Sequence, residues 1–83
     1  MAMHVEVSKR ATKELALLEK QDRERIDAAI KSLPQGDVCK IQGKKTLFRL
    51  TVGDYRVLYD RIGREIMVKT IMKREDIYRK GLH

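Results

Sequence analysis

The fold of this chain is organised around one stretch, LFRLTVGDYRVLY, which spans Leu47–Tyr59. Two runs rich in β-branched and aromatic residues flank Gly53-Asp54, a pattern that predicts a β-hairpin with a two-residue turn. Such a turn sets the register of the two strands. The expected cross-strand pairs are Val52 with Tyr55, Thr51 with Arg56 and Leu50 with Val57.

Because side chains alternate along a strand, the hairpin has two different faces. One face is apolar and is expected to cover a core: Phe48, Leu50, Val52, Tyr55, Val57 and Tyr59. The other face carries Arg49, Thr51, Arg56 and Leu58. Arg49 and Arg56 are diagonal neighbours there, and like charges this close are unfavourable unless an anion lies between them. The pattern therefore predicts a core side and an anion-binding side.

Length and charge narrow the possible classes of protein. The 83 residues predict a single domain, 1–83, close to the size at which one core is only just sufficient. A net charge of +7 predicts a polyanionic partner, a membrane surface or an acidic protein. No apolar run reaches transmembrane length and no signal-peptide pattern opens the chain, so a membrane partner is not expected.

Cysteine and histidine usage argues against metal or disulfide chemistry. The lone Cys39 cannot form an internal disulfide, which predicts a cytoplasmic protein. One cysteine and two widely separated histidines leave no metal-ligand spacing, so neither a metal nor another cofactor is expected.

The remaining segments predict an α+β fold. Met3–Val7 alternates as a strand, with Ser8 as a candidate cap for the helix that starts at Lys9. A second helical stripe runs from Ile26 to Leu33 and ends before Pro34. The alternating charges on both helices are interpreted as a solvated surface.

The segment 34–45 is expected to be a loop. Glu65–Met72 is expected to be a strand that places Lys69 on the face of Arg56, and Lys73–Lys80 a short helix. The predicted order is β-α-α-β-β-β-(short α), with a helical hairpin packed on one face of a mostly antiparallel four-stranded sheet.

Three motifs in this order resemble the RelE/ParE superfamily of toxins from toxin–antitoxin systems. They are Val38–Gly43, similar to the lysine-rich lead-in of that family, Phe48–Tyr59, similar to its hairpin, and Lys73–Arg79, similar to its closing segment. The chain departs from the family where Thr51 replaces a frequent arginine and Lys73 a frequent histidine. The resemblance implies a RelE-like fold and an acidic antitoxin as partner. In that family, RelE-type members cleave mRNA in the ribosomal decoding site, whereas ParE-type members inhibit DNA gyrase and lack the nuclease residues.

Metal-free RNA cleavage uses the 2′-hydroxyl as nucleophile on the adjacent phosphate, and needs proton transfer and positive charge on the phosphorane. We expect Arg49 and Arg56 to hold the scissile phosphate, since arginine can bind two phosphate oxygens at once. Tyr78 is expected to stack on, or exchange protons with, the substrate nucleotide. Arg74 is expected to stabilise charge or to act as the acid. The expected mRNA- and rRNA-binding residues are Lys40, Lys44, Lys45, Lys69 and Lys73.

Three functional classes stay open at this point. The first is a ribosome-dependent endoribonuclease toxin that inhibits translation, which the hairpin and the closing arginine and tyrosine favour. The second is a ParE-like gyrase inhibitor without nuclease activity. The third is an inactive relative that acts only as an antitoxin or a nucleic-acid binder.

Overall fold

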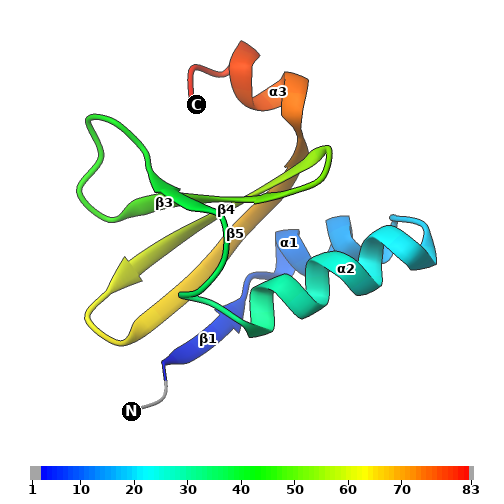
Figure 1. Ribbon diagram of the computed structural model, residues 1–83, viewed down its shortest axis with the longest axis horizontal. Coiled ribbons are helices and arrows are strands. Elements are labelled where there is room, and N and C mark those ends of the chain that lie inside the picture. Colours follow the sequence, from blue (N-terminus) through cyan, green and yellow to red (C-terminus); the bar gives the residue numbers. More distant parts are fainter. Residues whose placement is uncertain (1–2, 83) are drawn as a thin grey trace.

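The computed structural model describes residues 3–82, which form three helices and one five-stranded sheet (Figure 1). In chain order the elements are β1 (His4–Val7), α1 (Lys9–Ala16), α2 (Lys20–Lys31), β2 (Val38–Lys40), β3 (Leu47–Val52), β4 (Tyr55–Ile62), β5 (Glu65–Lys73) and α3 (Arg74–Arg79). The α+β class, the helical hairpin and the order of the predicted elements are confirmed.

The strand order across the sheet is β1-β5-β4-β3-β2. All neighbours are antiparallel except β1, which pairs parallel with β5. The predicted number of four strands is wrong, because part of the expected loop 34–45 forms β2 against β3. Three residues are too few to show an alternating pattern, so this strand is defined by its pairing rather than by its own sequence.

The β3–β4 hairpin has the register that the sequence predicts, with Val52 opposite Tyr55 and Leu50 opposite Val57. Gly53 has a φ of +56°, and among the described residues no residue other than glycine has a positive φ. A turn in which only the first central residue has a positive φ fits the Gly-Asp order. Glycine is therefore required at position 53 by the backbone.

The main core lies between the sheet and the helical hairpin of α1 and α2 (Figure 1). Its buried residues are Ala11, Ile26, Ile30, Leu33, Leu50, Val57, Tyr59, Ile66, Val68 and Ile71. The Phe48 and Tyr59 rings stack with centroids 5.5 Å apart. The face of the hairpin that was predicted to be apolar thus covers the core, and the opposite face is left for another use.

A second, smaller cluster covers part of that opposite face. Ile77 of α3, Ile41 and Leu58 are buried together, so α3 packs on the side of the sheet away from α1 and α2 (Figure 1). Leu58 is 4% exposed. The predicted anion-binding side is therefore not a wholly open surface, because α3 and the segment after β2 bury its middle.

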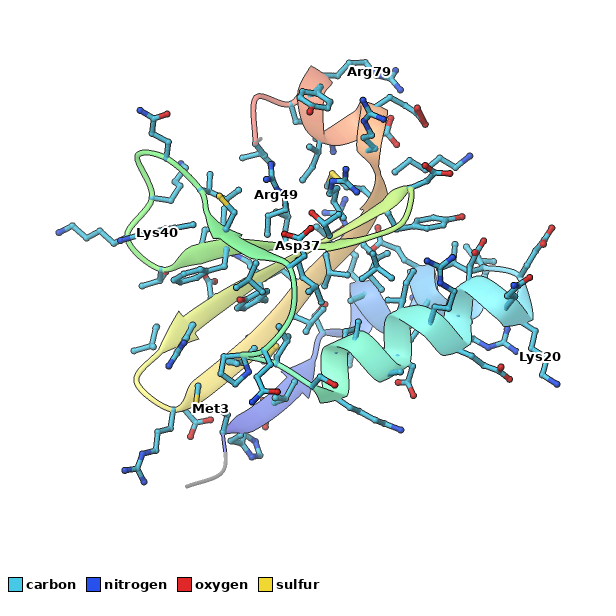
Figure 2. The ribbon with its side chains drawn as sticks, viewed as in Figure 1. Met3, Lys20, Asp37, Lys40, Arg49 and Arg79 are labelled. Carbon is cyan, nitrogen blue, oxygen red and sulfur yellow. The ribbon has the colours of Figure 1, made fainter. Side chains whose placement is uncertain are left out.

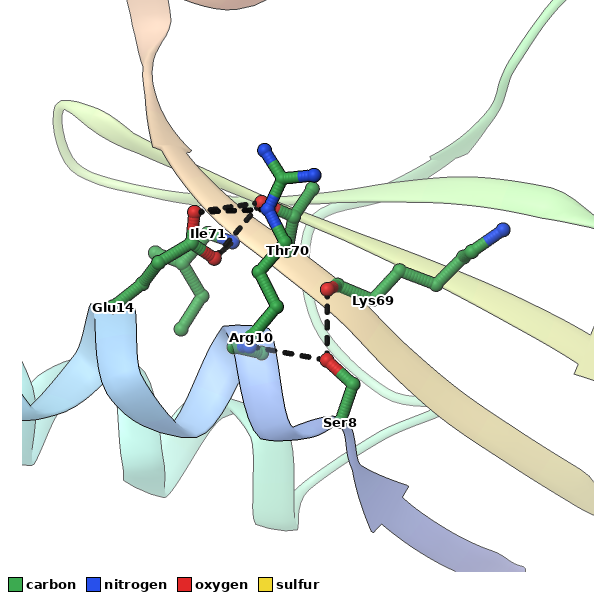
Figure 3. A network of polar contacts seen from close by, with 7 residues as sticks. Ser8, Arg10, Glu14, Lys69, Thr70 and Ile71 are labelled. Carbon is green, nitrogen blue, oxygen red and sulfur yellow. Dashed lines mark hydrogen bonds and ion pairs between the residues drawn. The ribbon is translucent and has the colours of Figure 1, made fainter.

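Beyond the end of β1, side chains rather than a neighbouring strand form hydrogen bonds with the backbone of β5 (Figure 3). Ser8 Oγ donates to the Lys69 carbonyl at 2.8 Å and accepts from the Ala11 N–H at 3.0 Å, so it is also the predicted cap of α1. The register of β5 against β4 shifts beside Lys69, since Leu58 pairs with Thr70 but Tyr59 pairs with Val68. This register shift is typical of a β-bulge, in which one strand carries an extra residue.

Candidate nucleic-acid interface

Arg56 is held at the tip of the β3–β4 hairpin by its own turn. Its Nη1 donates to the Gly53 carbonyl at 2.8 Å and to the Tyr55 carbonyl at 2.9 Å. Among the described residues, Nε and Nη2 of Arg56 have no protein partner. The guanidinium is thus fixed in place while part of its donor set remains available, which is the arrangement that an anion site requires.

Arg49 lies diagonally from Arg56 on the same face, because Arg49 pairs with Leu58 and Thr51 pairs with Arg56. Its side chain rises from β3 on the side of the sheet where α3 lies (Figure 2). Its Nε is buried and, within residues 3–82, makes no hydrogen bond. A buried cationic donor without an acceptor is costly, so this site is suited to receive an anion.

Lys73, Arg74 and Tyr78 line a cleft of about 610 Å³ at the hairpin tip. The cleft lies between Gly53-Asp54, the α2 helix and the start of α3. The Arg74 guanidinium lies 6.0 Å from the centroid of the Tyr78 ring, a cation–π distance. Tyr78 is 52% exposed, so much of its side chain is accessible to solvent.

The structure therefore separates the four predicted catalytic residues into two groups around one hairpin tip. Arg49 and Arg56 do not line the cleft that holds Arg74 and Tyr78. Lys73 links the two groups, because it pairs with Tyr55 at the start of β4.

Tyr55 contributes to this cleft although the sequence assigned it to the core. Its hydroxyl donates to the Asp22 carboxylate of α2 at 3.4 Å. Burial raises the pKa of Tyr55 above its usual value, and the negative charge of Asp22 raises it further. Tyr55 is thus a neutral hydrogen-bond donor that connects the hairpin to the N-terminal half of α2.

The predicted lysines lie farther out. Lys40, Lys44 and Lys45 are exposed in and after β2, and Lys40 extends away from α3 (Figure 2). Lys69 is in an ion pair with Asp60 at 3.3 Å, so its charge is partly compensated. Lys40, Lys44 and Lys45 do not line the cleft that holds Arg74 and Tyr78.

Arg25 of α2 is the lining residue that sequence reasoning missed, since it was counted with the solvated helix charges. It lies in the same cleft as Arg74 and Tyr78. No spacing in the sequence signals this position, because it depends on where α2 crosses the hairpin.

Within the described residues, no group of three or more His, Cys, Asp or Glu side chains could hold a metal ion. In the same part of the chain, no helix has the length and apolar character needed to cross a membrane.

The sequence matches no protein-family model and no curated protein. Solved structures are nevertheless similar. The RelE–RelB complex from Pyrococcus horikoshii aligns with a TM-score of 0.71 at 28% identity, covering 89% of this chain and 97% of that one. The RelB–RelE antitoxin–toxin complex from Methanococcus jannaschii aligns with a TM-score of 0.75 at 25% identity, covering 89% of this chain and 95% of that one.

An arginine-to-alanine double variant of E. coli RelE in the free state aligns with a TM-score of 0.75 at 22% identity, covering 98% of this chain and 95% of that one. These similarities confirm the RelE-like fold that the three sequence motifs predicted. They support a toxin of the RelE superfamily.

Proposed function

We propose that this chain is the toxin of a type II toxin–antitoxin system and an endoribonuclease that cleaves mRNA in the decoding site of the ribosome. One observation carries the proposal beyond the fold. Two pairs of cations, Arg49 with Arg56 on one face of the hairpin and Lys73 with Arg74 at its tip, form no ion pair with a carboxylate within residues 3–82. Cations that form no ion pair keep their charge available to bind phosphate.

Arg49 and Arg56 bind the scissile phosphate in this proposal. The carbonyls of the turn orient Arg56 and leave Nε and Nη2 to donate to phosphate oxygens. A phosphate between the two arginines also supplies an acceptor for the buried Nε of Arg49. Preorganised donors of this kind stabilise the phosphorane more than the ground state, because negative charge grows in the transition state.

Tyr78 and Arg74 act on the nucleotide next to that phosphate. The accessible Tyr78 ring stacks on a base, as aromatic side chains do in sites for single-stranded RNA. Arg74, beside the ring, adds positive charge near the leaving oxygen. The 2′-hydroxyl of the RNA attacks the phosphorus, the bond from phosphorus to the 5′-oxygen breaks, and a 2′,3′-cyclic phosphate forms. One proton passes in net from the 2′-oxygen to the 5′-oxygen, through Tyr78 or Arg74, and the step needs no cofactor.

The lysines guide the chain to mRNA and rRNA. Lys40, Lys44 and Lys45 are exposed on one side of the sheet, and Lys69 and Lys73 extend this charge along β5. Such long-range attraction raises association rates and weakens as salt increases.

An acidic antitoxin is the proposed protein partner. The similar structures from P. horikoshii and M. jannaschii are complexes of RelE with RelB. By analogy, we propose that a partner rich in Asp, Glu and apolar residues holds this chain inactive, and that its binding segment folds on contact. The net charge of +7 predicts that association is fast and sensitive to salt.

The deciding experiment is inducible expression without a partner, followed by mapping of mRNA 5′ ends and a gyrase supercoiling assay on the same protein. We expect new 5′ ends in translated messages only, an arrest of protein synthesis and unchanged supercoiling. Loss of supercoiling while translation continues would instead establish a ParE-like gyrase inhibitor. Normal growth with neither effect would establish an inactive binder.

A further inference from the structure

We propose that Arg25 of α2 is an additional RNA-binding residue that carries the RNA path across the hairpin tip onto the helical layer. The inference deepens the proposed function and depends on it for the identity of the ligand. It assigns a function to a helix whose charges are otherwise explained as a solvated surface.

Arg25 differs from the other cations of its helix. Lys20 pairs with Glu24 at 3.9 Å, Lys31 pairs with Asp27 at 3.0 Å, and Arg23 Nη1 donates to the Leu18 carbonyl at 3.2 Å. Within residues 3–82, Arg25 makes no hydrogen bond and no ion pair. Three of the four cations of α2 thus have partners, and Arg25, the fourth, is exposed beside a cleft.

The hairpin tip is shaped to let Arg25 come close. A Cβ built on Gly53 would lie 3.2 Å from Arg25 Nη2 and 3.6 Å from Nη1. The absence of a side chain at position 53 therefore lets the guanidinium lie against the turn. The same turn holds Arg56 through the Gly53 carbonyl, so Arg25 and Arg56 approach one turn from two elements.

Arg25 also lies where two clefts meet. The cleft of about 610 Å³ that holds Arg74 and Tyr78 has Arg25 and Gly53 in its lining. A second cleft, of about 500 Å³, shares these two residues and continues along α2 and β3 toward Gly36. A chain that occupied both clefts would pass the unpaired guanidinium of Arg25, because Arg25 lines each of them.

The lining of the groove favours single-stranded RNA over an acidic peptide. Lys73 and Arg74 join Arg25 as cations, and Tyr78 offers a partly exposed ring. The same cleft contains three carboxylates, Asp22, Asp54 and Glu75. These carboxylates repel phosphates as well as the side chains of an acidic peptide, but they can accept hydrogen bonds from the amino groups of bases, which acidic side chains do not offer. RNA provides phosphate for the cations, a ring for Tyr78 and amino donors for the carboxylates.

The test uses a fluorescent 2′-O-methyl RNA dodecamer, which lacks the nucleophile and cannot be cleaved. Its binding to the purified chain is measured by anisotropy over a range of salt concentrations. We expect Arg25→Gln to weaken binding about tenfold at low salt, since one charge-assisted contact is lost. We also expect the slope of log K against log salt to fall by about 0.7, the value for one phosphate on a single strand.

Lys20→Gln is the matched control, because it removes the same charge from the same helix outside the groove. Arg25→Lys should keep the salt slope and lose part of the affinity, since lysine keeps the charge but not the planar fork. Thermal unfolding of each variant checks that the fold is intact. Equal RNA affinities for Arg25→Gln and Lys20→Gln would overturn the inference. A wild-type chain that does not bind the dodecamer would also overturn it. So would an Arg25→Gln variant that loses affinity for an acidic protein partner but not for the dodecamer.

The two proposals fail separately. If the wild-type chain cleaves translated mRNA but Arg25→Gln binds RNA like the control, only the role of Arg25 is wrong. If no cleavage occurs on ribosomes while Arg25→Gln loses RNA affinity and salt slope, the nuclease assignment is wrong and the RNA-binding role of Arg25 stands.

Discussion

The carboxylate of Glu14 on α1 accepts a hydrogen bond from the backbone N–H of Ile71 on β5 at 2.9 Å (Figure 3). It also accepts from Thr70 Oγ1 at 2.9 and 3.0 Å. At this point β1 has ended, so a helix side chain takes over the hydrogen bonding that a strand would provide. The contact holds α1 against the part of β5 that leads into α3.

We therefore predict that Glu14→Ala lowers the free energy of unfolding by about 1–3 kcal/mol, because a partly buried N–H and a hydroxyl lose a charged acceptor. Glu14→Gln keeps one acceptor oxygen and should lose less. Urea unfolding measures both. Glu24→Ala is the control, since Glu24 is exposed and, in the part of the chain that the structure describes, pairs only with Lys20. A Glu14→Ala protein as stable as the control would show that the network does not stabilise the fold.

Arg56→Ala should lower cleavage on ribosomes by about 10²–10³-fold, by analogy with the loss of one preorganised oxyanion donor. The fold should remain, because within residues 3–82 Arg56 donates hydrogen bonds only to carbonyls of its own turn. The rate is measured with purified ribosomes and a defined mRNA, and Arg61→Ala, an exposed change at the far end of β4, serves as control. If the folded Arg56→Ala variant kept full cleavage activity, the catalytic site would have to lie on another face of the protein.

His4 should titrate with a pKa above its usual 6.5, because it lies 3.0 Å from Glu6 and shares the field of Glu65. Since the folded state raises this pKa, the stabilisation by the pair is fully present below pH 6.5 and is lost as the pH rises through the folded value. An NMR titration of the imidazole protons tests this. Glu6→Gln should return the pKa of His4 toward 6.5, and an unchanged value would assign the shift to another cause.

Tyr55 and Tyr59 should stay protonated above pH 10, because burial is the first cause that raises the pKa of each. A raised pKa stabilises the folded state below pH 10, and this contribution is lost as the pH rises through the folded pKa values. Absorbance at alkaline pH follows the ionisation. Asp22→Asn should bring the ionisation of Tyr55 to lower pH and leave that of Tyr59 unchanged. If both tyrosines shifted together, global unfolding rather than the local charge would be the cause.

The chain should be recoverable from its native operon only in complex with an acidic protein. Its net charge of +7 makes the association rate fall as salt rises, whereas buried apolar contacts control dissociation. Stopped-flow mixing of the separated components at several salt concentrations measures the rate. Recovery of the free chain alone from healthy cells would contradict both toxin hypotheses.

Local pattern alone determined the β3–β4 hairpin, the existence of α1 and α2, and the face on which Arg49 and Arg56 lie. The bounds of α2 differ from the predicted stripe, since the helix already begins at Lys20 and ends at Lys31. Strand alternation and a two-residue turn at Gly53-Asp54 leave only one register that buries the apolar residues. The residues that set this register are therefore close together in the sequence. The helices follow in the same way from a periodicity that spans many residues. Recognition of the RelE-like fold followed from these motifs in order, and the similar structures confirm it.

Contacts between distant segments were decided only by the tertiary structure. β2 exists because Val38–Lys40 reaches β3, and its three residues carry no period of their own. The burial of Leu58 depends on α3 returning over the sheet. Arg25 lies over the hairpin tip because α2 packs across it and Gly53 leaves space. In each case the determining partner lies far away along the chain, so no local window of sequence contains the interaction that places the residue.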